Sequence, residues 1–94
     1  MAREHVEGKD KGDVQLYALS TCVWCKMTKA LLENLDIGFD YVYVDQLEGE
    51  EKEKALDEVK RWNPRCSFPS LVVNGKTCIV GYKEDEIKAA VDAA

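Results

Sequence analysis

Three features are missing from this 94-residue sequence, and each absence excludes a class of protein. No apolar run approaches the roughly 20 residues that a membrane-spanning helix needs. Positive charge is scarce, since 13 Lys and Arg stand against 18 Asp and Glu for a net charge of -5, whereas nucleic-acid phosphates call for a basic face. Residues 1–13 are polar and lack the apolar segment of a secretory signal. We therefore expect a cytoplasmic protein with neither a nucleic-acid nor a membrane partner.

The amino-acid composition is that of one small globular domain. Hydrophobic residues make up 46% of the chain and charged residues 33%, a balance found in folded rather than disordered chains. A chain of this length can bury roughly two-thirds of its unfolded surface, which is enough for one modest core. We expect a single monomeric domain over residues 14–94, preceded by residues 1–13 as a mobile arm or a short edge strand.

Short apolar stretches rich in β-branched and aromatic residues predict the strands. Four such stretches lie at residues 14–19, 39–45, 70–73 and 76–80. Asn74 and Gly75 separate the last two and predict a hairpin, because both residues tolerate a positive φ. The first two are separated by a predicted helix and should therefore be parallel, joined by a right-handed crossover. The pattern predicts an α/β fold with a mixed four-stranded sheet.

Apolar residues at helical spacing predict three helices. The first follows Ser20 or Thr21, either of which can cap it, and ends near Asp36. The second covers residues 48–62 and the third residues 83–94. The positions expected to face the core are Met27, Ala30, Leu31 and Leu35 in the first helix, Leu56 and Val59 in the second, and Ile87, Ala90 and Val91 in the third.

The segment STCVWC places two cysteines at the junction between the first strand and the first helix. Cys22 lies where the helix begins and Cys25 one turn later, a spacing that brings two sulfur atoms close enough to bond. The free N–H groups and the positive dipole end of a helix start stabilise a thiolate, and Lys26 and Lys29 add positive charge. The thiolate is the attacking species in thiol–disulfide exchange. We therefore predict that Cys22 attacks and that Cys25 resolves the mixed disulfide.

Two other uses of these cysteines stay open. A zinc site generally needs four ligands. The other two cysteines are Cys66 and Cys78, and His5 is the only histidine. Zinc binding by all four cysteines is therefore one alternative. A purely structural disulfide within the first pair is the other, although it would close a loop too small to stabilise the fold much.

Taken in order, the strand, STCVWC, helix, strand, helix, SFPS, hairpin, GYKEDEI and final helix resemble a glutaredoxin of the thioredoxin superfamily, over residues 14 to about 92. The resemblance implies a thioredoxin-like fold of order β-α-β-α-β-β-α, with helices on both faces of the sheet. It also implies an enzyme, a dithiol protein-disulfide oxidoreductase with Cys22 as nucleophile and Cys25 as resolving cysteine. Pro69 matches the cis-proline that faces the cysteine pair in this family, and Phe68 would offer its backbone to an extended substrate.

The resemblance further implies a substrate surface around the pair. Its residues are Thr21, Val23, Trp24, Lys26, Phe68, Pro69, Gly81 and Tyr82. The sequence departs from glutathione-using glutaredoxins in three places. Val23-Trp24 replaces the common Pro-Tyr between the cysteines, and no basic residue closely precedes Cys22. Gly81 is followed by Tyr82 rather than by a second glycine.

These departures favour the glutaredoxin-like hydrogen donors, which take electrons from a thioredoxin-reductase-type flavoprotein and serve targets such as ribonucleotide reductase. We expect no bound cofactor, and disulfide-bearing proteins as substrates. The expected electron donor is glutathione, another low-molecular-weight thiol or a flavoprotein reductase. The alternative is a binding module, because some glutaredoxins hold an iron–sulfur cluster through cysteine thiolates. The bulky Val23 and Trp24 weigh against it.

Four further side chains have surroundings or roles that their positions in the sequence suggest. Trp24 either contacts a partner or folds against the domain. Cys78, inside a strand, is expected to be a small buried hydrophobe. Cys66, three residues before Pro69, is expected to be incidental, with a regulatory or second resolving role as the alternative. His5 is expected to be exposed and without a role.

Overall fold

A five-stranded mixed sheet forms the centre of the structure, a computed structural model that describes residues 4–9 and 12–92. Its strands are β1 (Glu4–Val6), β2 (Val14–Ala18), β3 (Phe39–Tyr43), β4 (Ser70–Val73) and β5 (Thr77–Val80), in the order β1-β3-β2-β4-β5. β2 and β3 are parallel, and β4 is antiparallel to both β2 and β5. The predicted parallel pair and the predicted hairpin are both confirmed. Asn74 and Gly75 form the hairpin turn with φ values of 54° and 61°.

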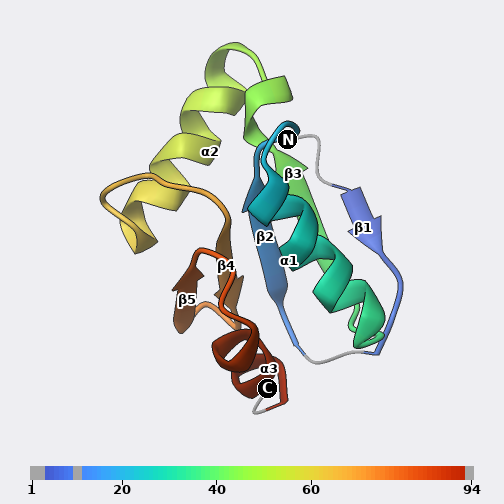
Figure 1. Cartoon of the computed structure of the whole chain (residues 1–94). Helices are drawn as coiled ribbons and strands as arrows, with labels where there is room; N and C mark the ends of the chain where they lie inside the picture. The colour runs from blue at the N-terminus through green and yellow to red at the C-terminus, as the bar shows by residue number, and fades with distance from the viewer. Residues whose placement is uncertain (1–3, 10–11, 93–94) are drawn as a thin grey trace.

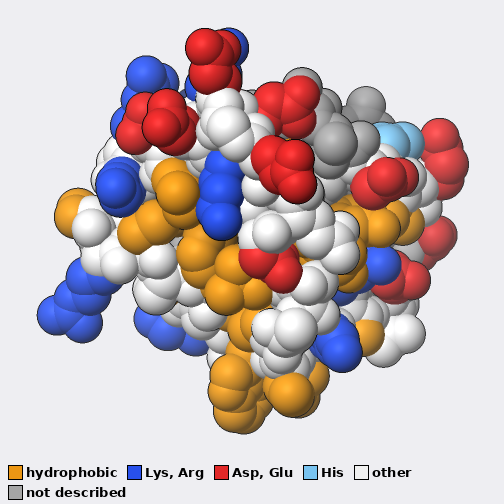
Figure 2. Space-filling view, turned by 90° about the horizontal axis from the view of Figure 1, so that it is seen from above, with side chains coloured by type: hydrophobic (Ala, Val, Ile, Leu, Met, Phe, Trp, Pro, Cys, Tyr) orange, Lys and Arg blue, Asp and Glu red, His pale blue; other side chains and the backbone are white. Residues whose placement is uncertain are grey.

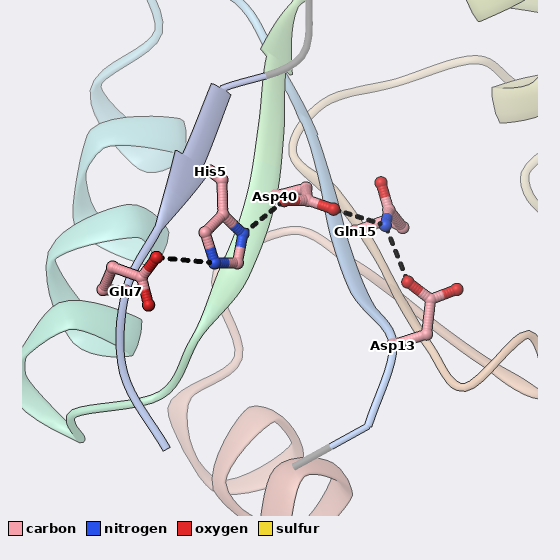
Figure 3. Close-up of polar contacts among 5 residues, drawn as sticks. All are labelled: His5, Glu7, Asp13, Gln15 and Asp40. Atoms are coloured by element: carbon pink, nitrogen blue, oxygen red, sulfur yellow. Dashed lines mark hydrogen bonds and ion pairs between the residues drawn. The ribbon is translucent and has the colours of Figure 1, made fainter. Parts of the chain in front are cut away.

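The strand β1 corrects the prediction of a four-stranded sheet. It pairs antiparallel with β3, and His5 lies opposite Asp40. Its residues are mostly exposed, so they lack the apolar pattern from which strands are predicted. A side-chain contact supports the pairing, because His5 Nδ1 lies 2.6 Å from Asp40 Oδ1 of β3, while its Nε2 lies 3.6 Å from Glu7 Oε1 in its own segment (Figure 3). Gln15 Nε2 donates to both Asp13 and Asp40. His5 is exposed as expected, yet it ties β1 to β3.

Helices cover both faces of the sheet, as the resemblance implied. α1 (Val23–Asn34) and α3 (Glu84–Asp92) pack on one face, and α2 (Gly49–Trp62) packs on the other (Figure 1). A short 3-10 turn, η1 (Val44–Gln46), follows β3, so that strand ends two residues earlier than predicted. The fold is therefore thioredoxin-like, with one additional edge strand.

α1 differs from its prediction at both ends. Its N-cap is Cys22, whose sulfur accepts a hydrogen bond from a backbone N–H of the first turn, rather than Ser20 or Thr21. Its last residue is Asn34, and Asp36 beyond it has a left-handed φ of 57°. The predicted stop was therefore two residues late, because a left-handed residue lies outside the helix that it terminates.

The buried side of α1 is also rotated relative to the predicted one. Its buried residues are Cys25, Thr28, Leu31 and Leu32. Met27 and Ala30, which were expected to face the core, are exposed instead. Thr28 can be buried because its hydroxyl donates to the Trp24 carbonyl at 2.9 Å, which satisfies a polar group that apolar spacing alone would place outside.

Two apolar clusters lie on opposite faces of the sheet. Alternate residues of β2 belong to different clusters: Leu16 packs toward α1 and α3, and Tyr17 toward α2, as the two-residue period of a strand requires. Ile87 and Val91 of α3 are completely buried in the first cluster, and Val59 of α2 in the second. The inward positions predicted for these two helices are confirmed, with Leu56 and Ala90 packed at the margins.

Candidate active site

The start of α1 places Cys22 and Cys25 together. Cys22 follows the turn after β2, and its N–H donates to the Leu19 carbonyl at 3.2 Å. The Cys22 Sγ accepts from the Cys25 N–H at 3.2 Å, so the first sulfur caps the helix. Both cysteines are free thiols. Cys22 is half-buried, whereas Cys25 is 1% exposed. One sulfur of the pair is therefore far more accessible than the other.

Burial also separates the chemistry of the two thiols. Desolvation, supported by a hydrogen bond with the Cys22 side chain, raises the pKa of Cys25 to about 12. A buried thiol resists ionisation because the thiolate loses its hydration. Cys25 therefore keeps its proton near neutral pH, while Cys22 is the more accessible sulfur at the helix start. The arrangement suits a first attack by Cys22 and a later attack by Cys25.

The sheet edge beside the pair is built by three strand ends. The Phe68–Pro69 peptide bond is cis, as the resemblance implied. Ser70 pairs with Tyr17, so Pro69 lies beside the end of β2 that leads into Cys22. The Gly81 N–H donates to the Pro69 carbonyl at 2.9 Å, which joins the end of β5 to the same edge. Gly81 adopts a φ of 88°, a conformation that glycine takes without steric cost.

An aromatic stack extends from α1 to the segment after β5. The rings of Trp24 and Tyr82 lie 6.2 Å apart between centroids with an interplanar angle of 23°. Trp24 nevertheless remains 58% exposed and Val23 65% exposed. Trp24 thus packs against the domain on one side and presents apolar surface on the other. Figure 2 shows hydrophobic side chains gathered across the face seen from above, between basic and acidic side chains.

The remaining predicted substrate residues lie around this surface. Thr21 and Lys26 are exposed, and Phe68 is half-buried against both apolar clusters. Lys83, beyond Tyr82, lies 3.6 Å from Glu86 and is therefore partly neutralised. The contacts of Gly81 with Pro69 and of Tyr82 with Trp24 thus bring segments from both halves of the chain to the end of the sheet where α1 begins.

Cys66 and Cys78 do not join the first cysteine pair. Both pack against the cluster on the α2 face, whereas Cys22 and Cys25 belong to the cluster on the α1 face. Burial raises the pKa of Cys78, and Cys66 has a positive φ of 52°. The four cysteines therefore do not gather in one site. Within residues 4–9 and 12–92, no group of three or more His, Cys, Asp or Glu side chains is arranged to hold a metal ion.

Sequence reasoning missed Asp45, which lies in η1. Its carboxylate accepts from the Ser20 N–H at 2.9 Å and from the Ser20 hydroxyl at 2.5 Å. Ala18 pairs with Tyr43 at the ends of β2 and β3, so Ser20 and Asp45 each lie two residues beyond a paired position. The signal was available, because the carboxyl ends of neighbouring parallel strands meet at the same edge.

The fold and the cysteine pair define the class of this protein: a thioredoxin-like redox protein with a C-x-x-C dithiol at a helix start. The glutaredoxin family model matches residues 14–78. The chain therefore belongs to the glutaredoxin family. Among its described helices, none is long and apolar enough to cross a membrane.

Three similar proteins illustrate the family relationship. The glutaredoxin from Methanosarcina mazei Go1 is 55% identical with a TM-score of 0.90, over 95% of this chain and 86% of that one. The methanoredoxin of Methanosarcina acetivorans is 51% identical with a TM-score of 0.87, over 89% and 88%. An uncharacterized glutaredoxin-like 8.6 kDa protein in the rubredoxin operon of Clostridium pasteurianum is 28% identical over 80 residues, which are 84% of this chain and 97% of that protein.

Proposed function

We propose that this protein is a dithiol thiol–disulfide oxidoreductase that reduces protein or small-molecule disulfides. The observation that carries the proposal is the difference in accessibility and protonation between its two thiols. Cys22 is the more accessible sulfur and caps a helix start, whereas Cys25 is buried and retains its proton. In thiol–disulfide exchange by a dithiol, one accessible sulfur attacks the substrate disulfide, and the second sulfur later attacks the mixed disulfide.

The proposed cycle moves two electrons. The Cys22 thiolate attacks one sulfur of the substrate disulfide, forming a mixed disulfide and releasing the other substrate sulfur as a thiolate. Cys25 then loses its proton to that thiolate or to water and attacks the Cys22 sulfur. This second step forms the Cys22–Cys25 disulfide and releases the second substrate thiol. The substrate is thereby reduced to two thiols, and an electron donor returns the protein to its dithiol form.

The substrate surface is proposed to comprise the eight residues predicted around the pair. An extended substrate segment would pair with the backbone at Phe68, in the manner of an added strand. Trp24 and Tyr82 would cover an apolar side chain of the substrate, since the stacked ring of Trp24 stays more than half exposed. Gly81 leaves the approach open, because it has no side chain.

The proposed electron donor is a flavoprotein reductase or a low-molecular-weight thiol, with glutathione as a slow donor. Support comes from the uncharged turn before Cys22 and from the contact of Lys83 with Glu86, which leave Lys26 as the exposed cation next to the pair. Ribonucleotide reductase is one proposed target, in a cytoplasmic setting. The Clostridium relative in a rubredoxin operon is consistent with a role among electron carriers.

The test is reduction of a protein disulfide by the full-length reduced chain. Two new substrate thiols should appear for each protein molecule that gains a Cys22–Cys25 disulfide, identified by mass spectrometry. The variant Cys22→Ser should release none, while the matched control Cys66→Ser should behave as the parent. A parent protein that leaves the substrate oxidised, or an active Cys22→Ser variant, would overturn the proposal.

A further inference from the structure

The turn that delivers Cys22 to α1 is fastened to the neighbouring strand end by one side chain. Asp45 receives both hydrogen-bond donors of Ser20, the backbone N–H at 2.9 Å and the hydroxyl at 2.5 Å. We propose that Asp45 is a positioning residue that, through Ser20, holds Cys22 in place for disulfide exchange. This inference rests on the proposed function and adds a residue to its machinery.

Asp45 is exposed, but the residues on either side of its turn are buried. It lies in η1 between Val44, which is 1% exposed, and Leu47, which is 6% exposed, and both pack in the cluster on the α2 face. The Leu47 N–H donates to the Val44 carbonyl at 3.2 Å and closes the turn around it. A carboxylate on such a base can fix a flexible turn, because charge-assisted hydrogen bonds are stronger than neutral ones.

The turn on the other side depends on that anchor. It runs from the end of β2 to Cys22, and the Cys22 N–H donates to the Leu19 carbonyl across it at 3.2 Å. Leu19 and Cys22 at its ends pack against the two apolar clusters, whereas Thr21 is exposed and Ser20 half-exposed, so packing holds the middle of the turn less than its ends. Small displacements of a reacting atom reduce rates sharply. The two bonds from Ser20 to Asp45 therefore bear directly on where the Cys22 sulfur lies.

The charge of Asp45 also acts on the dithiol. The charged groups that act on Cys25 are Cys22 and Asp45, and both favour its protonated form. Around Asp45, the hydrogen bonds from Ser20 lower the pKa of the carboxyl, and Lys52 of α2 adds to that effect. A carboxylate with a lowered pKa is a poor proton acceptor at neutral pH. Asp45 thus acts through position and charge, rather than as the base that deprotonates Cys25.

The experiment isolates the first chemical step in the Cys25→Ser background, where only Cys22 of the pair reacts. Asp45→Asn removes the charge and keeps one acceptor, Ser20→Ala removes one donor and keeps the charge, and the two are also combined. Asp57→Asn, an exposed charge on α2, is the matched control. Formation of the mixed disulfide is followed from acidic to alkaline pH, and thermal unfolding of each variant is recorded.

The rate on the alkaline plateau reports the position of the reacting sulfur, and the pH dependence of the rate reports the effect of the Asp45 charge. We expect Asp45→Asn and Ser20→Ala each to lower the plateau roughly two- to fivefold. The double variant should be no slower than Asp45→Asn, because both changes act on the same contact between Ser20 and Asp45. The pH dependence of the rate should differ from that of the parent only where the charge is lost, and added salt should reduce that difference.

Plateau rates and pH dependences that match those of Asp57→Asn in both single variants would overturn the assignment while the parent still exchanges. If the Cys25→Ser parent itself forms no mixed disulfide at any pH, both the proposed function and the role of Asp45 are wrong. That result differs from the first one, in which the parent reacts and only the role of Asp45 is wrong. Should Asp45→Asn lower the melting temperature, Ser20→Ala still decides the positional claim, because it leaves the carboxylate in place.

Discussion

The chain holds two pairs of cysteines that differ in surroundings rather than in number. Cys22 and Cys25 lie at a helix start on the α1 face of the sheet, one sulfur half-buried and the other hidden behind it. Cys66 and Cys78 pack against the α2-face cluster, one after a helix and one within a strand. Only the first pair combines an accessible sulfur, a helix dipole and a protonated second thiol. We therefore expect the reactivity of each cysteine to depend on its position.

The largest expected effect is the trapping of a mixed disulfide, which should occur at the first cysteine pair and not at the second. Cys25→Ser should accumulate a mixed disulfide between Cys22 and a protein substrate, because the resolving sulfur is gone. Cys78→Ser, which removes a thiol from the other pair, should accumulate none and turn over like the parent. Non-reducing electrophoresis with mass mapping of the linked peptide provides the measurement. A trapped complex at Cys66, or one formed equally by Cys78→Ser, would abolish the distinction between the pairs.

Limited alkylation of the reduced parent tests the same distinction without any mutation. At slightly acidic pH, Cys22 should be labelled first and Cys25 last, since Cys25 is 1% exposed and its pKa is raised to about 12. Peptide mapping at increasing reagent doses gives the order. Labelling of Cys25 ahead of Cys22 would reverse the assigned roles.

Burial of Cys25 also makes the reduced protein less stable as the pH rises through the alkaline range. Its pKa lies near 12 in the folded chain against an ordinary value of 9.0, so the unfolded chain releases this proton first. The stabilising contribution is therefore complete below about pH 9 and is lost as pH rises toward 12. Cys25→Ala should show a shallower decline in the free energy of unfolding than the parent, measured by urea titration between about pH 8 and 11.

The second pair provides the control for this pH effect. Burial raises the pKa of Cys78 as well, but its side chain is only half-buried. Cys78→Ala should therefore change the slope less than Cys25→Ala. Equal slopes in the parent and in Cys25→Ala would show that the buried thiol does not control the decline.

The sequence predicted those parts of the site whose residues lie close together in the chain. Cys22 and Cys25 share one helical turn, so their spacing already predicted that they lie together. Pro69 was assigned through the resemblance alone, because a proline at a strand start is ordinarily trans. The contact between Trp24 and Tyr82 joins segments far apart in the chain and has no local pattern that would predict it.

The fold shows the same division. The apolar patterns of β2, β3 and the hairpin predicted the sheet and its parallel pair. β1 was only one of two alternatives for residues 1–13, since its residues are exposed and it is held by pairing with β3. The inner side of α1 was misjudged at Met27 and Thr28, because a buried hydroxyl that bonds to its own helix carries no apolar signal.

The aromatic stack gives an expected effect of intermediate size. Trp24→Ala removes the exposed ring that stacks on Tyr82, and should raise the KM for a protein disulfide roughly two- to tenfold. A small disulfide, which covers less of the surface, should be affected less. Trp62→Ala is the matched control, since Trp62 is also exposed but ends α2 outside the predicted substrate surface. Equal losses in both tryptophan variants would indicate a general effect on the fold.

The smallest expected effect concerns which donor restores the dithiol. Glutathione carries two carboxylates and needs cationic partners on both sides of its sulfur. Here the turn before Cys22 is uncharged, Lys26 is exposed, and Lys83 lies 3.6 Å from Glu86. Steady-state rates at equal thiol concentration should rank glutathione below a flavoprotein reductase or another small thiol. Lys26→Ala and Lys83→Ala should each change the glutathione rate by less than about twofold, because exposed charges contribute little. If glutathione is the fastest donor and the lysine variants lose that rate, the site is that of a glutathione-dependent glutaredoxin.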